Sequence, residues 1–88
     1  MFTVYALQSE VDGGLYIGLT SNIERRLHQH NSGQTRSTRS RAPLTLFYTE
    51  SHPSLAHARA REIYLKSGVG RELLKEQPGW RNRQTQRT

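Results

Sequence analysis

Two short runs with strand-like alternation open the sequence, and a turn separates them. Side chains alternate in character through residues 2–8 and again through residues 15–19. The stretch between these runs contains Asp12-Gly13-Gly14, a combination typical of turns. The pattern predicts a β-hairpin. If the two strands pair, a period of two lets Tyr5 and Tyr16 project from the same side.

Gly18 follows Tyr16 on the same face of the second predicted strand. A glycine inside a strand often marks a place where a ligand or another backbone comes close. We therefore expect open backbone at Gly18, where a phosphate group could approach.

The later segments predict helices and a third strand. Ser21 and Glu24 have the spacing of a capping box, with the Ser21 hydroxyl accepting from the Glu24 amide. The helix that starts there is expected to run to about His30 and to stop at residues 31–33. Residues 34–41 contain no apolar side chain and predict a loop. The remaining predicted elements are a strand, a helix and a short helical segment: residues 44–49, 54–66 and 71–75.

The composition limits the class of protein. Eighty-eight residues suffice for one small domain, and 33% of them are hydrophobic. No apolar run approaches the roughly 20 residues of a transmembrane helix, and the N-terminus lacks the basic segment of a signal peptide. The absence of cysteine excludes disulfides and thiolate metal sites. We expect a cytoplasmic protein that does not bind membranes.

The formal net charge of +6 is unevenly placed. Arg36, Arg39 and Arg41 lie close together in the polar stretch, and three more arginines follow Pro78-Gly79. Scattered charge would indicate a solvated surface, but clustered guanidinium groups favour phosphate binding. Because Pro78-Gly79 is a turn signal, we expect a folded domain over residues 1–76 and a mobile basic tail over residues 77–88.

Glu62 interrupts an apolar stripe on the second predicted helix. Leu55, Ala58 and Leu65 share its sector of the helical wheel. A carboxylate on such a face needs a cation, a metal ion or water. Spacing alone favours an ion pair with Arg59 or Lys66. The other interpretation is a single Mg²⁺ that keeps several waters and takes its remaining ligands from a phosphate.

The other polar residues that could form a site also have ordinary structural interpretations. Tyrosines in strands usually belong to a sheet face, and Tyr5 and Tyr16 are by default such residues. Arg26 could simply solvate its helix, and His30 would ordinarily be a surface histidine. Arg26 and His30 are nevertheless i, i+4 neighbours and can meet on that helix.

Taken in order, the motifs resemble the GIY-YIG nuclease superfamily, and its small stand-alone bacterial members in particular. Those members are related to the N-terminal nuclease domain of the excision-repair incision subunit. The resemblance covers about residues 2–75. It rests on five matching stretches: Val4-Tyr5, Tyr16-Ile17-Gly18, residues 20–27, residues 30–33, and Ala60-Arg61-Glu62 with Leu65-Lys66.

The resemblance implies an α/β fold with a small three-stranded, mainly antiparallel sheet flanked by helices. It implies phosphodiester hydrolysis with a single divalent cation, Mg²⁺ or Mn²⁺. Tyr16 would be the general base or its relay, Tyr5 would support the attacking water, and Arg26 would stabilise phosphate charge. His30 would be a proton shuttle or phosphate contact, and Glu62 the metal ligand. The residues expected to contact nucleic acid are Gly18, Arg36, Arg39, Arg41 and Lys66.

Three departures from the family pattern stand out. Thr3 takes the place of the glycine in the family name. Leu19 takes the place of a lysine that the repair-subunit relatives carry, which removes one cation from the site. Residues 67–76 contain no counterpart of a later site asparagine.

Two functions from different classes follow. The first is a metal-dependent DNA endonuclease acting on damaged, flapped or branched DNA, in repair or recombination. The second is a catalytically weak DNA- or RNA-binding module on the same fold, which Leu19 favours. The set of Tyr5, Tyr16, Arg26 and Glu62 favours the enzyme.

Overall fold

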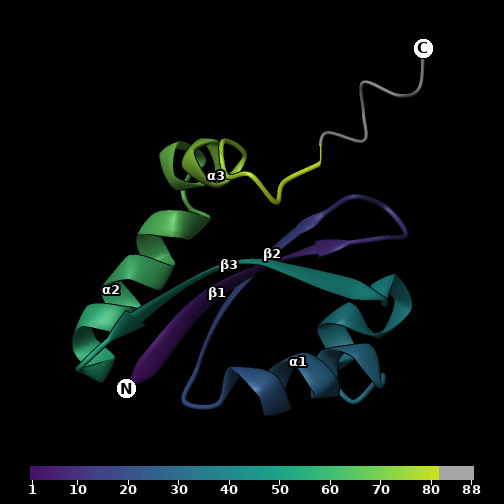
Figure 1. The fold of residues 1–88 in the computed structure, drawn as a ribbon, viewed down its shortest axis with the longest axis horizontal. Coiled ribbons are helices and arrows are strands. Elements are labelled where there is room, and N and C mark those ends of the chain that lie inside the picture. Colours follow the sequence, from purple (N-terminus) through teal and green to yellow (C-terminus); the bar gives the residue numbers. More distant parts are fainter. Residues whose placement is uncertain (82–88) are drawn as a thin grey trace.

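The computed structural model describes residues 1–81, in which helices flank a three-stranded sheet (Figure 1). A short 3₁₀ helix, η1, precedes the last strand. The elements in chain order are β1 (Phe2–Ser9), β2 (Leu15–Thr20), α1 (Ile23–Asn31), η1 (Arg36–Arg41), β3 (Leu44–His52), α2 (Leu55–Lys66) and α3 (Gly68–Leu74). No helix in this part of the chain is long and apolar enough to cross a membrane.

The sheet has the order β2-β1-β3 and is antiparallel throughout. The first two strands form the predicted hairpin, with Tyr5 opposite Gly18 and Leu7 opposite Tyr16. Because directly opposed residues point to the same face, Tyr5 and Tyr16 share one side of the sheet, as the period of two predicts. The predicted fold class is confirmed.

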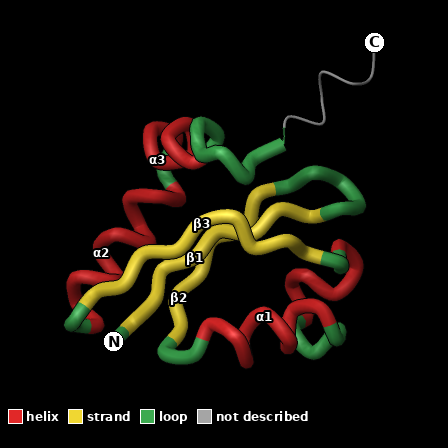
Figure 2. Tube along the Cα trace, in the orientation of Figure 1, coloured by secondary structure: helices red, strands yellow, loops and turns green. Residues whose placement is uncertain are grey.

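The two faces of the sheet carry separate hydrophobic clusters. On one face Tyr5, Leu7 and Leu44 form a buried cluster, against which side chains of α1 pack. On the other face Val4 and Ala6 pack with buried residues of α2 and α3. In Figure 2, α1 accordingly lies on the opposite side of the strands from α2 and α3. Alternation along β1 thus supplies both cores, which is why this central strand is almost wholly buried.

Several element boundaries differ from the sequence-based ones. The N-cap of α1 is Asn22, whose Oδ1 accepts from the Arg25 amide at 3.0 Å, so the expected Ser21 cap is wrong by one residue. The polar stretch expected to be a loop contains η1, β3 continues to His52, and α3 begins at Gly68. Ser54 caps α2 as predicted, with its hydroxyl accepting from the His57 amide.

The folded body extends beyond the boundary expected after residue 76. The Trp80 ring packs against Phe47 of β3 with ring centroids 5.6 Å apart. The Gln8 side chain donates to the Arg81 carbonyl at 2.6 Å and accepts from the Arg81 amide at 3.0 Å. The segment after α3 therefore lies against the sheet, and a tail starting at residue 77 is wrong for residues 77–81. The rest of the predicted tail, residues 82–88, lies outside the described residues.

Candidate active site

The Tyr5 hydroxyl is the centre of a buried polar network between β1 and α1. Tyr5 is only 2% exposed. Its oxygen lies 3.0 Å from His30 Nε2 and accepts from Arg26 Nε at 3.4 Å. The Tyr5 and His30 rings meet edge to face, with centroids 5.9 Å apart. Three residues that the sequence singled out are thus brought together at one oxygen atom.

Gly18 makes room for this network. A Cβ atom at Gly18 would lie 2.3 Å from the Tyr5 hydroxyl oxygen and 2.4 Å from Cζ. The Tyr5 ring therefore lies directly over the Gly18 backbone, across the strand pair. The phenol ring of Tyr5 thus fills the space on the Cβ side of Gly18, where open backbone was expected.

His30 is held as a neutral imidazole by its surroundings. It is 5% exposed, and burial lowers its pKa, as does the nearby positive charge of Arg26. Its second ring nitrogen, Nδ1, lies 2.8 Å from Thr38 Oγ1 in η1. Thr38 is itself 2% exposed and belongs to the site, although no sequence pattern indicated it. Only its position in a predicted polar loop was visible, and nothing there distinguished it from its neighbours.

Tyr16 lies on the same face of the sheet but has different partners. Arg41 donates a hydrogen bond to the Tyr16 hydroxyl, and its guanidinium carbon lies 5.5 Å from the centre of the Tyr16 ring. Arg41 Nε is also 3.3 Å from the Asp12 carboxylate. The Gly14 amide, which donates to Asp12, and the charge of Arg41 lower the pKa of this carboxyl despite some desolvation. One member of the arginine cluster is therefore engaged at a site tyrosine.

The other two arginines of η1 face solvent. Arg36 and Arg39 are both exposed, and Arg39 Nε donates to the Gly33 carbonyl at 3.1 Å. That bond uses one of the five guanidinium N–H donors of the exposed Arg39 side chain and leaves the four on its terminal nitrogens for other partners. Their geometry suits contacts with an anionic backbone.

Glu62 lies on α2, away from the two tyrosines. Its carboxylate is 3.1 Å from Lys66 Nζ and 3.7 Å from Arg59 Nε. The Glu62 side chain is 15% exposed, whereas both cations are about half exposed or more. Among residues 1–81 no hydrogen bond or ion pair joins Glu62 to Tyr5 or Tyr16. The ion pairs that the helical spacing favoured are thus present, and Lys66, expected to contact nucleic acid, is one partner.

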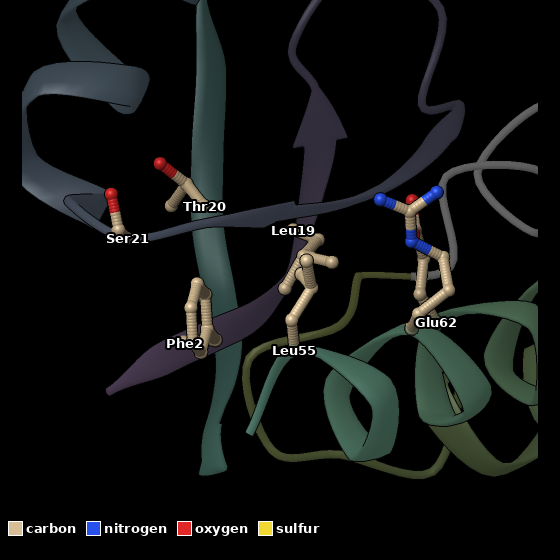
Figure 3. Close-up of a pocket in the computed structure, with 7 residues that line it drawn as sticks. Phe2, Leu19, Thr20, Ser21, Leu55 and Glu62 are labelled. Carbon is tan, nitrogen blue, oxygen red and sulfur yellow. The ribbon is translucent and has the colours of Figure 1, made fainter. Parts of the chain in front are cut away.

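A pocket of about 300 Å³ opens beside Glu62. Figure 3 shows Phe2, Leu19 and Leu55 on its apolar side, with Thr20 and Ser21 at the end of β2. Leu19 alternates with Gly18 and therefore faces the α2 side of the sheet. The edge strand β2 thus runs between Tyr16 on one face and the Glu62 pocket on the other.

A second polar cluster fixes α2 against β3 next to Glu62. Arg61 Nε donates to the Glu50 carboxylate at 2.8 Å, and the same carboxylate is 2.8 Å from His52 Nε2 and accepts from the Tyr48 hydroxyl. Burial opposes the charge of Glu50, but these donors hold its pKa below the ordinary value. The Glu50 carboxylate thus joins β3 to α2 through Arg61, and no spacing in the sequence pointed to it.

A divalent cation could bind at Glu62 only if water or substrate supplied most of its ligands. Within the described part of the chain no three His, Asp or Glu side chains are grouped as metal ligands. Glu62 can supply one carboxylate, and Mg²⁺ is commonly held by one or two carboxylates together with water and substrate phosphate. Such an ion would have to compete with Arg59 and Lys66 for the carboxylate oxygens.

The sequence and the fold of this chain are both similar to those of known proteins. A UPF0213 protein of Halobacterium salinarum is 40% identical over 67 residues, which cover 75% of this chain and 86% of that protein. A UPF0213 protein of Streptococcus sanguinis is 43% identical over 56 residues, covering 62% of this chain and 64% of that protein. The chain thus spans less than two thirds of some of the curated relatives it matches.

The solution NMR structure of a UPF0213 protein from Bacillus halodurans is similar over 100% of this chain and 99% of that one, with 32% identity and a TM-score of 0.55. A family model described as the GIY-YIG catalytic domain matches residues 1–75. These residues include the Tyr5 network, Tyr16, η1 and Glu62. The three relatives named above are UPF0213 proteins, and the chain therefore belongs to the GIY-YIG family.

Proposed function

We propose that this protein is a divalent-metal-dependent endonuclease that hydrolyses phosphodiester bonds in DNA, including branched, flapped or damaged DNA met in repair or recombination. The observation that carries the proposal is the meeting of Tyr5, Arg26 and His30 at one buried oxygen, on the sheet face that also bears Tyr16. Tyr5 and His30 are buried and Arg26 is partly buried, and burying polar groups is costly unless each is satisfied, so the arrangement constrains these side chains. The exposed arginines of η1 supply a surface for the anionic backbone.

Each residue has a distinct role in this proposal. Tyr16, as its phenolate, takes a proton from the attacking water and becomes a neutral phenol, and Arg41, which donates to the same oxygen, stabilises the phenolate before the transfer. Arg26 stabilises the charge that develops on the phosphate, while Tyr5 and His30 hold its guanidinium and the water in place. Glu62 would hold Mg²⁺ or Mn²⁺ at the β2 edge, and a cation bound there would polarise a phosphoryl oxygen and lower the pKa of bound water.

The position of β2 supports a substrate laid across the edge of the sheet. β2 has a neighbour on one side only, with Tyr16 on one face and the Glu62 pocket on the other. A phosphodiester at this edge can face both sets of side chains. On this proposal Arg36, Arg39 and Lys66 contact backbone phosphates without reading bases.

The test combines a cleavage assay with a metal-binding measurement. Labelled flap, nicked, branched and single-stranded DNAs are incubated with Mg²⁺ or Mn²⁺ and either the natural protein or Glu62→Gln. We expect cleavage to fall by orders of magnitude in Glu62→Gln while DNA binding stays the same. Mn²⁺ should broaden the NMR signals of Leu19 and Thr20 in the natural protein and leave them sharp in the variant.

Glu72→Gln is the matched control. Glu72 forms a similar ion pair on α3, with Lys75 Nζ 3.6 Å from its carboxylate, but it lies outside the pocket. Because the cationic partners of both glutamates are well exposed, each substitution should change the free energy of unfolding by less than about 1 kcal/mol. Cleavage that survives in Glu62→Gln at the natural rate would refute the role of Glu62. A Tyr16→Phe variant that cuts normally would refute the role of that hydroxyl.

A second candidate function is a DNA- or RNA-binding module that does not cut. The ion pairs of Glu62 with Lys66 and Arg59, together with apolar Leu19 in the same pocket, favour it, because both reduce the capacity to hold a cation. Salt-sensitive binding of the DNA panel, without cleavage under either metal and without Mn²⁺ broadening near Leu19, would support this function over the enzyme.

A further inference from the structure

The η1 turn presents two different surfaces. Its arginines are exposed, whereas Thr38 is its only buried residue. Thr38 Oγ1 lies 2.8 Å from His30 Nδ1, and the other nitrogen of that ring lies 3.0 Å from the Tyr5 hydroxyl. A single threonine therefore joins the arginine-bearing turn to the buried network of the candidate active site.

The donors and acceptors of this network determine which residue donates each hydrogen bond. Arg26 Nε can only donate, so Tyr5 accepts at that contact. The hydroxyl proton of Tyr5 then needs an acceptor, and among the described residues His30 Nε2 is the one within hydrogen-bond distance. A neutral imidazole that accepts at Nε2 carries its proton on Nδ1, and this proton points to Thr38 Oγ1. The resulting order of donation is Arg26 to Tyr5, Tyr5 to His30, and His30 to Thr38.

We propose that Thr38 is a positioning residue that holds His30 in the Nδ1–H tautomer, so that Nε2 stays free to accept from Tyr5. Its effect on cleavage rests on the proposed function, whereas its effect on the tautomer does not. The same hydrogen bond anchors η1 to His30, so the backbone that carries the exposed arginines keeps a fixed position relative to the Tyr5 hydroxyl. The burial that lowers the His30 pKa favours the neutral ring, and only a neutral imidazole has a tautomer to fix.

The alternative is that Thr38 only fills space. Threonine and valine have the same shape, so a residue needed for packing alone would tolerate Thr38→Val. The substitution removes the oxygen that accepts from Nδ1, however, and leaves a buried donor without a partner. The histidine would then gain by moving its proton or rotating, and either response releases the Tyr5 hydroxyl from its acceptor.

The experiment reads the tautomer directly. Long-range ¹H–¹⁵N NMR spectra of uniformly labelled protein at pH 7.5 distinguish a protonated Nδ1 from a protonated Nε2 for each histidine. We expect His30 to be an Nδ1–H tautomer in the natural protein and in Thr38→Ser, which keeps the hydroxyl. We expect Thr38→Val to lose this single tautomer. Thr35→Val is the matched control, because Thr35 precedes the same turn and its side chain makes no capping hydrogen bond.

Cleavage provides a second readout. In Thr38→Val, kcat should fall about tenfold or more with KM for DNA little changed, and Thr38→Ser should restore most of the rate. An Nε2–H tautomer in the natural protein would overturn the proposal, as would an unchanged His30 spectrum in folded Thr38→Val. If Thr38→Val does not fold, the spectra of the natural protein and of Thr38→Ser still decide. If the natural protein cuts no DNA, the proposed function fails while the NMR result continues to test Thr38.

Discussion

Replacing Gly18 by alanine should disrupt the candidate site through one methyl group. The new Cβ would lie 2.3 Å and 2.4 Å from two atoms of the Tyr5 side chain, far inside van der Waals contact. Tyr5 is 2% exposed and has no open space to enter. Gly18 is not among the glycines with positive φ, so the cost is steric and involves no backbone strain.

The size of the effect follows from two contributions. Overpacking a filled core costs about 1–3 kcal/mol. Displacing the Tyr5 ring also weakens its hydrogen bonds with His30 and Arg26, at about 1 kcal/mol each. We therefore expect Gly18→Ala to lower the free energy of unfolding by roughly 3–5 kcal/mol. For a domain of this size, that loss corresponds to a drop in Tm of about 15–25 °C.

Urea denaturation of a double-mutant cycle measures the predicted contact. In a Tyr5→Ala background the methyl group has room, so Gly18→Ala should cost almost nothing and the two substitutions should be strongly coupled. Gly68→Ala is a control, because a Cβ there meets nothing within 4 Å. A cost below about 0.5 kcal/mol for Gly18→Ala alone, or the same cost in both backgrounds, would show that Tyr5 does not lie over Gly18.

Three further outcomes are expected. Folding lowers the pKa of His30 from 6.5, so the unfolded chain binds a proton at this residue more readily than the folded chain does. The contribution of His30 to the free energy of unfolding is therefore complete above about pH 6.5 and is lost as pH falls through the lower folded-state pKa. His30→Gln should flatten this part of the stability–pH curve and exposed His28→Gln should not; parallel curves for both variants would refute the assignment. Replacing Arg36 and Arg39 with alanine should weaken binding of all DNA sequences about equally and reduce the slope of log affinity against log salt by about 0.9 for each lost phosphate contact, and an unchanged slope would mean that these arginines only solvate the surface. Truncation after residue 76 should cost about 1–3 kcal/mol by removing the Trp80 and Arg81 contacts, whereas truncation after Arg81 keeps them, so equal denaturation midpoints would contradict the role of the segment.

The strands and helices were predictable because local pattern determines them. The alternation around Tyr5 and Tyr16 follows the burial of alternate side chains, and the turn between them is formed by residues with turn preference. The proximity of Arg26 and His30 followed from helical spacing. Trp80 illustrates a signal that was present but misjudged: a lone large aromatic residue in a polar segment gains by finding an apolar partner, here Phe47.

The contacts that complete the site were not predictable, because they join segments far apart in the chain. Arg41 meets Tyr16 and Asp12 only after η1 and the hairpin turn are brought together. Thr38 lies in a segment without hydrophobic periodicity, so its burial depends on where η1 meets α1. The sequence did not show why a glycine is needed at position 18, since the strand pattern does not say which side chain covers its backbone.

The strand order has a consequence for how the chain folds. β1 pairs with its sequence neighbour β2 through a short turn, but its other partner, β3, follows α1 and η1, so that Ser9 pairs with Leu44 and Phe2 with His52. Closing the longer loop costs more chain entropy before any contact offsets it. The hairpin is therefore expected to form early and the docking of β3 to limit the folding rate. Asn31 assists this late step, because its side-chain amide donates to the Leu44 carbonyl and accepts from the Leu44 amide, as a neighbouring strand would.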